Sequence, residues 1–297
     1  MERFIDPKTL ARVRDLPLVA RTVAEGFLHG IQPSHQRGVG IEFSQYRSYE
    51  PGDDPARIDW KLYARSDRYF VREAERESEI GTWFVIDCSQ SMAQRSEDGA
   101  WSKFDYARHL VAALSWIAHR QGDPIGLLAL NAGESTILPL ATGERQWHRL
   151  LTQLHGLETG DRFPDANLLG SHLARLQSAG LAFIISDFHQ VSDEIYALVR
   201  RIANARNEVD GMQLLCADET RFPWRGPVRF EDLETGETVL VSGRAARDTY
   251  LAALDDYNDR LRAALGGIGV SLDSFDIDQP LDAALHHYLQ RRLRMPR

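Results

Sequence analysis

The amino-acid sequence predicts an α/β fold: a mostly parallel sheet with helices on both faces, joined to a small N-terminal β-rich accessory segment. From residue 82 onward, short apolar runs alternate with stretches of helical spacing, the pattern of strands and crossover helices. The apolar runs are nearly continuous, as in Trp83–Ile86, which favours strands buried on both faces. Residues 31–80 are instead rich in Gly, Arg, Asp and aromatic residues, and their short alternating runs predict antiparallel strands and turns.

The expected elements follow one another regularly along the chain. Residues 7–30 have a weakly amphipathic pattern that predicts one or two helices. Strands are expected at 82–87, 124–130, 135–140 (an edge strand), 181–186, 211–217 and 269–275. Helices are expected at 103–121, 145–155, 168–178, 192–206, 244–265 and 280–294. Ser102 and Asp105 have the spacing of a capping box at the start of the first of these helices.

A hairpin is expected at 226–242, with its turn at Glu234–Glu237. The chain shows no internal repeat, low-complexity tract or long linker. We therefore divide it at residue 80. Residues 1–80 hold the helical lead-in and the accessory segment, and residues 81–297 form one α/β domain that includes the hairpin.

The composition argues against several classes of protein. The chain of 297 residues has 35 basic and 43 acidic side chains, a net charge of −8. This disfavours a general nucleic-acid binder, because neutralising phosphates requires clustered Lys and Arg.

The two cysteines, Cys88 and Cys216, lie in or beside apolar runs and are expected to be buried free thiols in a reducing compartment. No signal peptide and no run of about 18 apolar residues is evident, so we expect a soluble, cytoplasmic protein.

Side chains with oxygen atoms follow two of the predicted strands. Asp87, Ser89 and Ser91 come directly after the first strand, and Asp187 directly follows the strand at 181–186. Because neighbouring strands lie about 4.8 Å apart and parallel strands end at one edge, we expect both carboxylates within reach of one ion. Carboxylate and hydroxyl oxygens suit Mg²⁺ better than Zn²⁺. The alternative, that these residues only cap the following helices, is less favoured because both strand ends carry them.

The runs Asp87–Met92 and Ile184–Asp187 resemble the metal-ion-dependent adhesion site of von Willebrand factor A domains. In that family, hydroxyls and carboxylates from three loops hold Mg²⁺, and a carboxylate from a partner protein can complete the octahedron. The resemblance implies a third loop within residues 159–168, where the usual Thr is replaced by Ala166. The candidates to replace its hydroxyl are Asp161, Asp165 and Thr159.

The segment before the sheet closely resembles the bacterial domain-of-unknown-function 58 family. The resemblance rests on Gly38–Phe43, Arg47–Asp54, Arg57–Trp60 and Ala64–Arg65, which occur in this order. In that family the signature precedes a von Willebrand A-like sheet, and the resemblance implies a partner, a MoxR-type AAA+ ATPase, in the assembly or chaperoning of complexes. We favour a structural clamp over a docking surface for the signature residues Asp53, Asp54, Arg57, Asp59, Trp60 and Arg65.

These features together predict a non-enzymatic protein–protein interaction module in which Mg²⁺ at the sheet edge binds an acidic side chain of the partner. The sequence contains neither the Gly-x-Ser-x-Gly motif of α/β-hydrolases nor the P-loop of ATPases. The alternative is a Mg²⁺-dependent phosphohydrolase that uses Asp87 as nucleophile or ligand, with Asp54 and Asp59 as further acids.

Overall fold

A computed structural model of the protein describes residues 15–30, 45–48, 63, 69–73, 81–96, 99, 101–133, 135–165, 169–173, 176, 180–189, 194–203 and 207–294. The chain divides into two compact units, residues 1–31 together with 80–297, and residues 32–79. Helix α2 (Leu16–Gly30) belongs to the first unit, although it precedes the accessory segment in the chain. The helical lead-in therefore groups with the sheet and not with the rest of residues 1–80.

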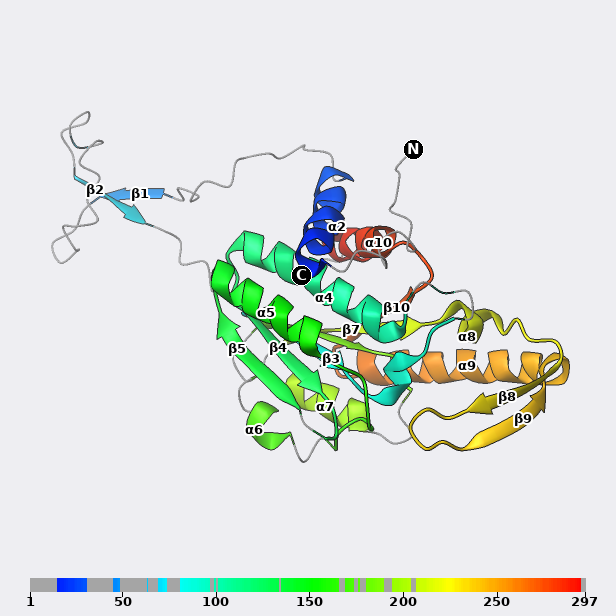
Figure 1. Cartoon of the computed structure of the whole chain (residues 1–297). Coiled ribbons are helices and arrows are strands. Elements are labelled where there is room, and N and C mark those ends of the chain that lie inside the picture. The colour runs from blue at the N-terminus through cyan, green and yellow to red at the C-terminus, as the bar shows by residue number, and fades with distance from the viewer. Residues whose placement is uncertain are drawn as a thin grey trace. The chain divides into compact units, whose positions relative to one another are not determined.

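The first unit is built on a six-stranded sheet with the strand order β10-β7-β6-β3-β4-β5 (Figure 1). In chain order its strands are β3 (Gly81–Asp87), β4 (Ile125–Leu130), β5 (Thr136–Ala141), β6 (Gly180–Ser186), β7 (Glu208–Leu215) and β10 (Ser271–Asp276). Every neighbouring pair is parallel except β4 and β5, which are antiparallel. The predicted mostly parallel sheet with an edge strand near residues 135–140 is therefore confirmed, and the structure shows that this edge strand is antiparallel.

The strand order also marks the place on the sheet where a ligand is expected. Numbered in chain order, the six strands lie as 3-2-1-4-5-6 across the sheet, the order of doubly wound folds. The winding direction reverses between the neighbours β3 and β6. In such sheets ligands bind outside the carboxyl ends of the strands at this switch point. Asp87 and Ser186 end these two strands, so the topology itself brings them to the switch point.

Helices cover both faces of the sheet (Figure 1). The buried side chains on one face come from α2, α4 (Lys103–Gln121), α5 (Glu144–Gly156) and α10 (Leu281–Arg294). Those on the other face come from α6 (Gly170–Leu173), α7 (Glu194–Ala203) and the end of α9 (Gly243–Gly266). All seven positions of β3 are buried, as its continuous apolar run predicts for a strand covered on both sides.

Helix α4 begins and ends where its sequence predicts. The backbone N–H of Asp105 donates to Ser102 Oγ at 3.0 Å, and the Ser102 N–H donates back to the Asp105 carboxylate at 3.3 Å, forming the expected capping box. Gly122 ends the helix with φ of 86°, a left-handed conformation that costs little in glycine. These caps fix Lys103 as the first helical residue, which determines where its side chain enters the site.

The predicted hairpin consists of β8 (Pro227–Glu231) and β9 (Thr238–Ser242), which form a separate antiparallel pair. It follows a short helix, α8 (Ala217–Arg221), that begins where the sequence predicted the end of a strand. Strand β7 stops at Leu215 because the N–H of Cys216 donates to Glu219 Oε2 at 2.7 Å, which starts a helical turn instead. The predicted strand at 211–217 is thus corrected at its end.

The second unit contains a two-stranded antiparallel sheet of β1 (Gln45–Ser48) and β2 (Phe70–Glu73). This confirms antiparallel strands within residues 31–80. The six signature residues lie outside the described residues, so their role as a clamp or a docking surface stays a prediction: Asp53, Asp54, Arg57, Asp59, Trp60 and Arg65.

Two further expectations concern the chain as a whole. Cys88 and Cys216 are buried free thiols, as their apolar surroundings in the sequence predict. In the described part of the chain, every helix is either too short or too polar to cross a lipid bilayer.

Candidate metal and partner-binding site

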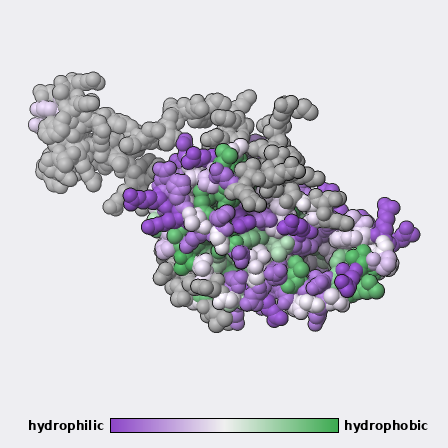
Figure 2. Space-filling model, in the orientation of Figure 1, coloured by the Kyte–Doolittle hydropathy of each residue, from purple (hydrophilic) through white to green (hydrophobic). Residues whose placement is uncertain are grey.

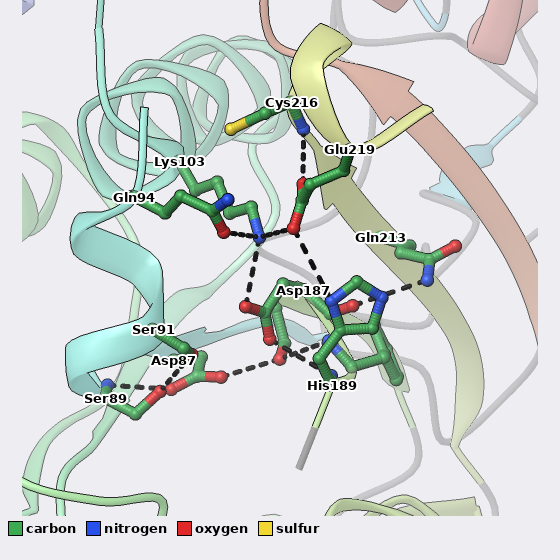
Figure 3. Close-up of polar contacts among 12 residues, drawn as sticks. Asp87, Ser89, Ser91, Gln94, Lys103, Asp187, His189, Gln213, Cys216 and Glu219 are labelled. Atoms are coloured by element: carbon green, nitrogen blue, oxygen red, sulfur yellow. Dashed lines mark hydrogen bonds and ion pairs between the residues drawn. The ribbon is translucent and has the colours of Figure 1, made fainter. Parts of the chain in front are cut away.

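The candidate site lies where β3 and β6 end side by side (Figure 3). Asp87 is the last residue of β3 and Asp187 directly follows β6, and each is 1% exposed. Ser186 Oγ donates to Asp87 Oδ2 at 2.6 Å and so joins the two strand ends. The structure thus brings together the two carboxylates that are 100 residues apart in the sequence.

The loop after β3 supplies the oxygen atoms of the candidate metal site. The N–H of Ser89 donates to Asp87 Oδ1 at 2.8 Å, which folds the loop back over the end of the strand. The hydroxyl oxygens of Ser89 and Ser91 lie 3.1 Å apart, with Ser91 in the short helix η2 (Gln90–Ala93). Adjacent ligands of an octahedral Mg²⁺ lie about 3 Å apart when its bonds are about 2.1 Å long. The spacing of the two hydroxyls therefore suits neighbouring ligands of one Mg²⁺.

The environment of Asp87 favours a positively charged ligand. Burial raises the pKa of Asp87 to about 7, and the negative charge of Asp187 adds to this effect. Hydrogen bonds from Ser186 and Ser89 lower the pKa but do not offset the burial. A cation beside the carboxylate favours its charged form, so metal binding and ionisation of Asp87 support each other.

A buried lysine, which the sequence interpretation did not single out, reaches into the same site. Lys103 Nζ donates to Asp187 Oδ2 at 3.2 Å, to Glu219 Oε1 at 2.8 Å and to Gln94 Oε1 at 2.9 Å (Figure 3). Its side chain is fully buried. One signal in the sequence could have indicated this network. A lysine in the first turn of a helix opposes the helix dipole and therefore needs acidic partners.

Lys103 and Asp187 stabilise each other in the charged form. Burial alone lowers the pKa of Lys103, but the carboxylates of Asp187 and Glu219 outweigh burial and raise that pKa above its usual value. Burial likewise acts to raise the pKa of Asp187, but Lys103 and His189 outweigh it and lower that pKa. A metal ion here would compete with Lys103 for Asp187. Asp87 is therefore the stronger candidate for a direct ligand, and Asp187 for a group that acts through water.

The loop expected to carry the third ligand is tied to the first loop by hydrogen bonds. The N–H of Gly160 donates to the carbonyl of Cys88, and the N–H of Gln90 donates to the carbonyl of Asp161, both at 3.0 Å. Asn131 Nδ2 donates to the carbonyls of Cys88 and Gly160 at 3.3 and 2.8 Å. Asn131, which follows β4, was missed in the sequence because a single Asn after a strand carries no distinctive pattern. It holds the two loops together at the switch point.

The residues proposed to replace the missing threonine have different surroundings. Asp161 and Asp165 are exposed, whereas Thr159 is half-buried. Ala166, where the resemblance places the usual Thr, lies outside the described residues. The ligand role of Asp165 therefore stays a prediction.

The chemistry of the donor set fits Mg²⁺ at the first loop. Across the described residues, no three His, Cys, Asp or Glu side chains are grouped as in a zinc site or an all-carboxylate cage. The candidate set is instead one carboxylate, Asp87, with the hydroxyls of Ser89 and Ser91. Such a set of hard oxygen ligands leaves coordination positions open, which Mg²⁺ ordinarily fills with water or with a group from a binding partner.

Comparison with known proteins places these residues within a described family. Residues 45–260 match the family described as "protein of unknown function DUF58". The chain is 30% identical over 293 residues to an uncharacterized protein of Mycobacterium bovis, covering 97% of this chain and 91% of the relative.

Two solved structures resemble this chain at low sequence identity. The conserved hypothetical protein BatB from Bacteroides thetaiotaomicron is 13% identical, with a TM-score of 0.45, covering 73% of this chain and 100% of that one. The SpRpn10 VWA domain is 14% identical, with a TM-score of 0.40, covering 69% of this chain and 93% of the domain.

Proposed function

Because the chain belongs to the DUF58 family of proteins of unknown function, with a von Willebrand factor A-like α/β sheet, we propose that it is a non-enzymatic, Mg²⁺-dependent protein-interaction module. The observation that carries the proposal is the convergence of Asp87, Ser89 and Ser91 at the switch point of the sheet. In this proposal the three side chains hold Mg²⁺, and a carboxylate of the partner protein becomes a further ligand. The ion supplies a localised positive charge that an acidic side chain of the partner can recognise.

The remaining residues of the site have supporting roles in this proposal. Lys103 holds Asp187 ionised at the edge of the site, Glu219 keeps Lys103 charged, and Asn131 fixes the two loops. Asp165 is proposed to contribute from the third loop. The proposed partner is a MoxR-type AAA+ ATPase, and what supports this choice is the family resemblance of the signature before the sheet.

A binding role is favoured over phosphohydrolase chemistry by the burial of the groups that catalysis would need. A nucleophilic aspartate must reach the phosphorus atom, but Asp87 is 1% exposed and its two oxygens accept hydrogen bonds from Ser89 and Ser186. The ammonium group of Lys103 donates to two carboxylates and to the side-chain amide oxygen of Gln94, so it is not poised to bind a phosphate. Turnover of a phosphatase substrate panel that is abolished in Asp87→Asn would reverse this preference.

The test combines direct metal binding with capture of the partner. We expect Mg²⁺ to raise the melting temperature of the wild-type chain, because a ligand that binds only the folded state stabilises it, and EDTA to remove the effect. Asp87→Asn, which retains an oxygen acceptor for the Ser89 N–H, and Ser89→Ala should lose the response. Asp248→Asn is the matched control, because it removes an acid whose side chain is 96% exposed on α9.

The same four proteins are then used to capture a purified MoxR-type ATPase, with Mg²⁺ and with EDTA. The proposal predicts capture that depends on Mg²⁺ in the wild type and in Asp248→Asn, and reduced capture by the two site variants. Equal capture under all conditions would contradict a metal-dependent contact, and no capture under any condition would contradict this choice of partner.

A further inference from the structure

The loop that carries Asp187 is held in place by helix α9. The hydroxyl of Tyr257, on α9, donates to the backbone carbonyl of Phe188, although the two residues are 69 positions apart in the sequence. The rings of Tyr257 and His189 lie edge to face, with their centroids 5.6 Å apart. One side chain of α9 therefore contacts both of the residues that directly follow Asp187.

A buried amide joins the same helix to Asp187 itself. Gln213, in β7, is fully buried, and its Nε2 donates to Asn258 Oδ1, on α9, at 3.0 Å. The same nitrogen donates to the backbone carbonyl of Asp187 at 3.4 Å (Figure 3). The hydroxyl of Ser274, in β10, donates to Gln213 Oε1 at 2.9 Å, which fixes the orientation of the amide. Asn258 directly follows Tyr257, so one turn of α9 provides both links to the loop.

The backbone of Phe188 in turn orients Asp87, the strongest candidate for a metal ligand. The Phe188 N–H donates to Ser186 Oγ at 3.0 Å, and Ser186 Oγ donates to Asp87 Oδ2 at 2.6 Å. The Ser186 hydroxyl accepts the first bond with a lone pair, so its single proton remains directed at Asp87. A movement of Phe188 would therefore alter a hydrogen bond that holds the carboxylate of Asp87.

Phe188 has a backbone conformation that is uncommon for its residue type. Its φ is 59°, in the left-handed region that a bulky side chain seldom adopts. Its ring is fully buried, and a Cβ atom on Gly211 would lie only 3.3 Å from Phe188 Cζ. The packed ring and the hydrogen bonds of the N–H and carbonyl groups hold the residue in this conformation. Loss of the bond from Tyr257 would remove one of these restraints.

Helix α9 is lightly held elsewhere. Among its 24 residues, all within the described chain, the buried ones are Gly243, Asn258 and Leu265. The helix directly follows β9, whose Leu240 is 73% exposed, and Figure 2 shows apolar surface gathered at the hairpin end of the molecule. Elements with few buried contacts move at low cost. The contacts of Tyr257 and Asn258 are therefore the place where a movement of α9 would reach the site.

We propose that α9 positions the metal site, with Tyr257 as the positioning residue. Tyr257 acts through the backbone of Phe188, and the amide of Gln213 provides a second link between α9 and the loop. The inference rests on the proposed function, since it assumes that a cation binds beside Asp87. The affinity for Mg²⁺, and for a partner that needs Mg²⁺, then depends on where α9 lies. Because coupling between sites is reciprocal, Mg²⁺ also strengthens the contact between the loop and α9.

The first experiment measures binding of Mg²⁺ alone to the full chain by titration calorimetry. Tyr257→Phe removes one hydroxyl and keeps the ring, and it should weaken Mg²⁺ binding by about fivefold or more, as in typical couplings between sites. Tyr250→Phe is the matched control, because it removes the same group from the same helix at a ring that stacks near Phe222. This control should leave the affinity within about twofold.

Two further measurements separate positioning from simple packing. Urea unfolding gives the stability of each variant, and a residue that only packs would lower the stability while leaving the Mg²⁺ affinity of the folded chain unchanged. Hydrogen exchange at the amides of residues 186–189 should be faster in Tyr257→Phe than in Tyr250→Phe, because the loop has lost a restraint. In the wild type, saturating Mg²⁺ should slow the exchange of the same amides.

The outcomes distinguish this inference from the proposed function. Equal Mg²⁺ affinity in Tyr257→Phe and Tyr250→Phe would overturn the inference and leave the proposed function intact. Weaker Mg²⁺ binding with unchanged exchange at residues 186–189 would overturn the route through Phe188. Exchange in the wild type that does not respond to bound Mg²⁺ would overturn the reciprocal coupling. Absence of Mg²⁺ binding in the wild type would overturn both the inference and the metal-dependent function.

Discussion

At the scale of single residues, the most consequential side chain in the site is Lys103. It is fully buried between Asp187 and Glu219, and its ammonium group is held by both carboxylates. Such an arrangement depends on all its members, because removing one charge leaves the others buried without compensation. The stability of the fold and the ionisation of Asp187 are therefore linked through one side chain.

Lys103→Met should lower the free energy of unfolding by about 3–5 kcal/mol, the usual cost of leaving a buried charge unpaired. Adding Glu219→Gln should recover part of this loss, since it removes one uncompensated carboxylate and retains an acceptor for the Cys216 N–H. Urea unfolding followed by circular dichroism measures both changes. Arg149→Met, at an exposed position on α5, should change the stability by less than about 0.5 kcal/mol. A Lys103→Met variant as stable as this control would contradict the role of Lys103 in compensating the buried carboxylates.

The capping box of α4 gives a pH dependence at the same scale. Burial acts to raise the pKa of Asp105, but hydrogen bonds from Ser102 and Arg108 outweigh it and lower that pKa below the usual 3.8. A carboxyl group with a lowered pKa stabilises the folded state above its unfolded-state pKa and loses this contribution as the pH falls through the folded-state value. Asp105→Asn should therefore be about 1 kcal/mol less stable near pH 7.

The difference between the wild type and Asp105→Asn should shrink as the pH falls below about 4, where the wild-type carboxyl group also becomes neutral. Paired urea titrations from neutral to acidic pH measure this difference directly, so the titration of other groups cancels. A difference that stays constant over this range would show that the negative charge of Asp105 does not contribute to stability.

At the scale of elements, the contact between β3 and β6 determines how closely the two site loops approach. Gly180 pairs with Gly81 at the start of these strands, and a Cβ atom on Gly180 would lie 2.3 Å from the Gly81 carbonyl oxygen. Backbone atoms cannot move aside as a flexible side chain can. The strands therefore need glycine at this position.

Gly180→Ala should destabilise the protein by about 1–3 kcal/mol, as overpacking does in a close-packed interior. Gly156→Ala is the matched control, because a Cβ atom there meets nothing within 4 Å and alanine is favoured over glycine in a helix. Thermal unfolding of both variants measures the contrast. Equal melting temperatures would show that β3 and β6 accommodate the added methyl group without loss of stability.

The hairpin shows how an element can be predicted while its role is not. Alternating residues around a Glu-Thr-Gly-Glu turn indicate a hairpin at 226–242, and β8 and β9 confirm it. Nothing in these residues indicates that Phe230, next to the turn, packs in an aromatic cluster with Phe222 and Trp224. The direction of the hairpin depends on this packing, which involves residues from three separate segments.

At the scale of the whole molecule, the winding of the chain places the site. The strand order makes β3 and β6 neighbours although β4 and β5 lie between them in the sequence. The loops after β3 and β6 therefore meet at the switch point, and hydrogen bonds from Asn131 and Gly160 bring the third loop to the same place. The proposed function needs all three loops, so it depends on the arrangement of the whole sheet and not on any single motif.

The sequence by itself determined the α/β class, the strands, the caps of α4, the hairpin and the candidate oxygens of Asp87, Ser89, Ser91 and Asp187. These features are readable because apolar runs, cap residues and turn residues act over a few positions, and because parallel strands end at a common edge. Only the tertiary structure decided that Lys103 is paired with both Asp187 and Glu219. These contacts join side chains separated by 84 and 116 positions, and they depend on how whole elements pack, which no local pattern records.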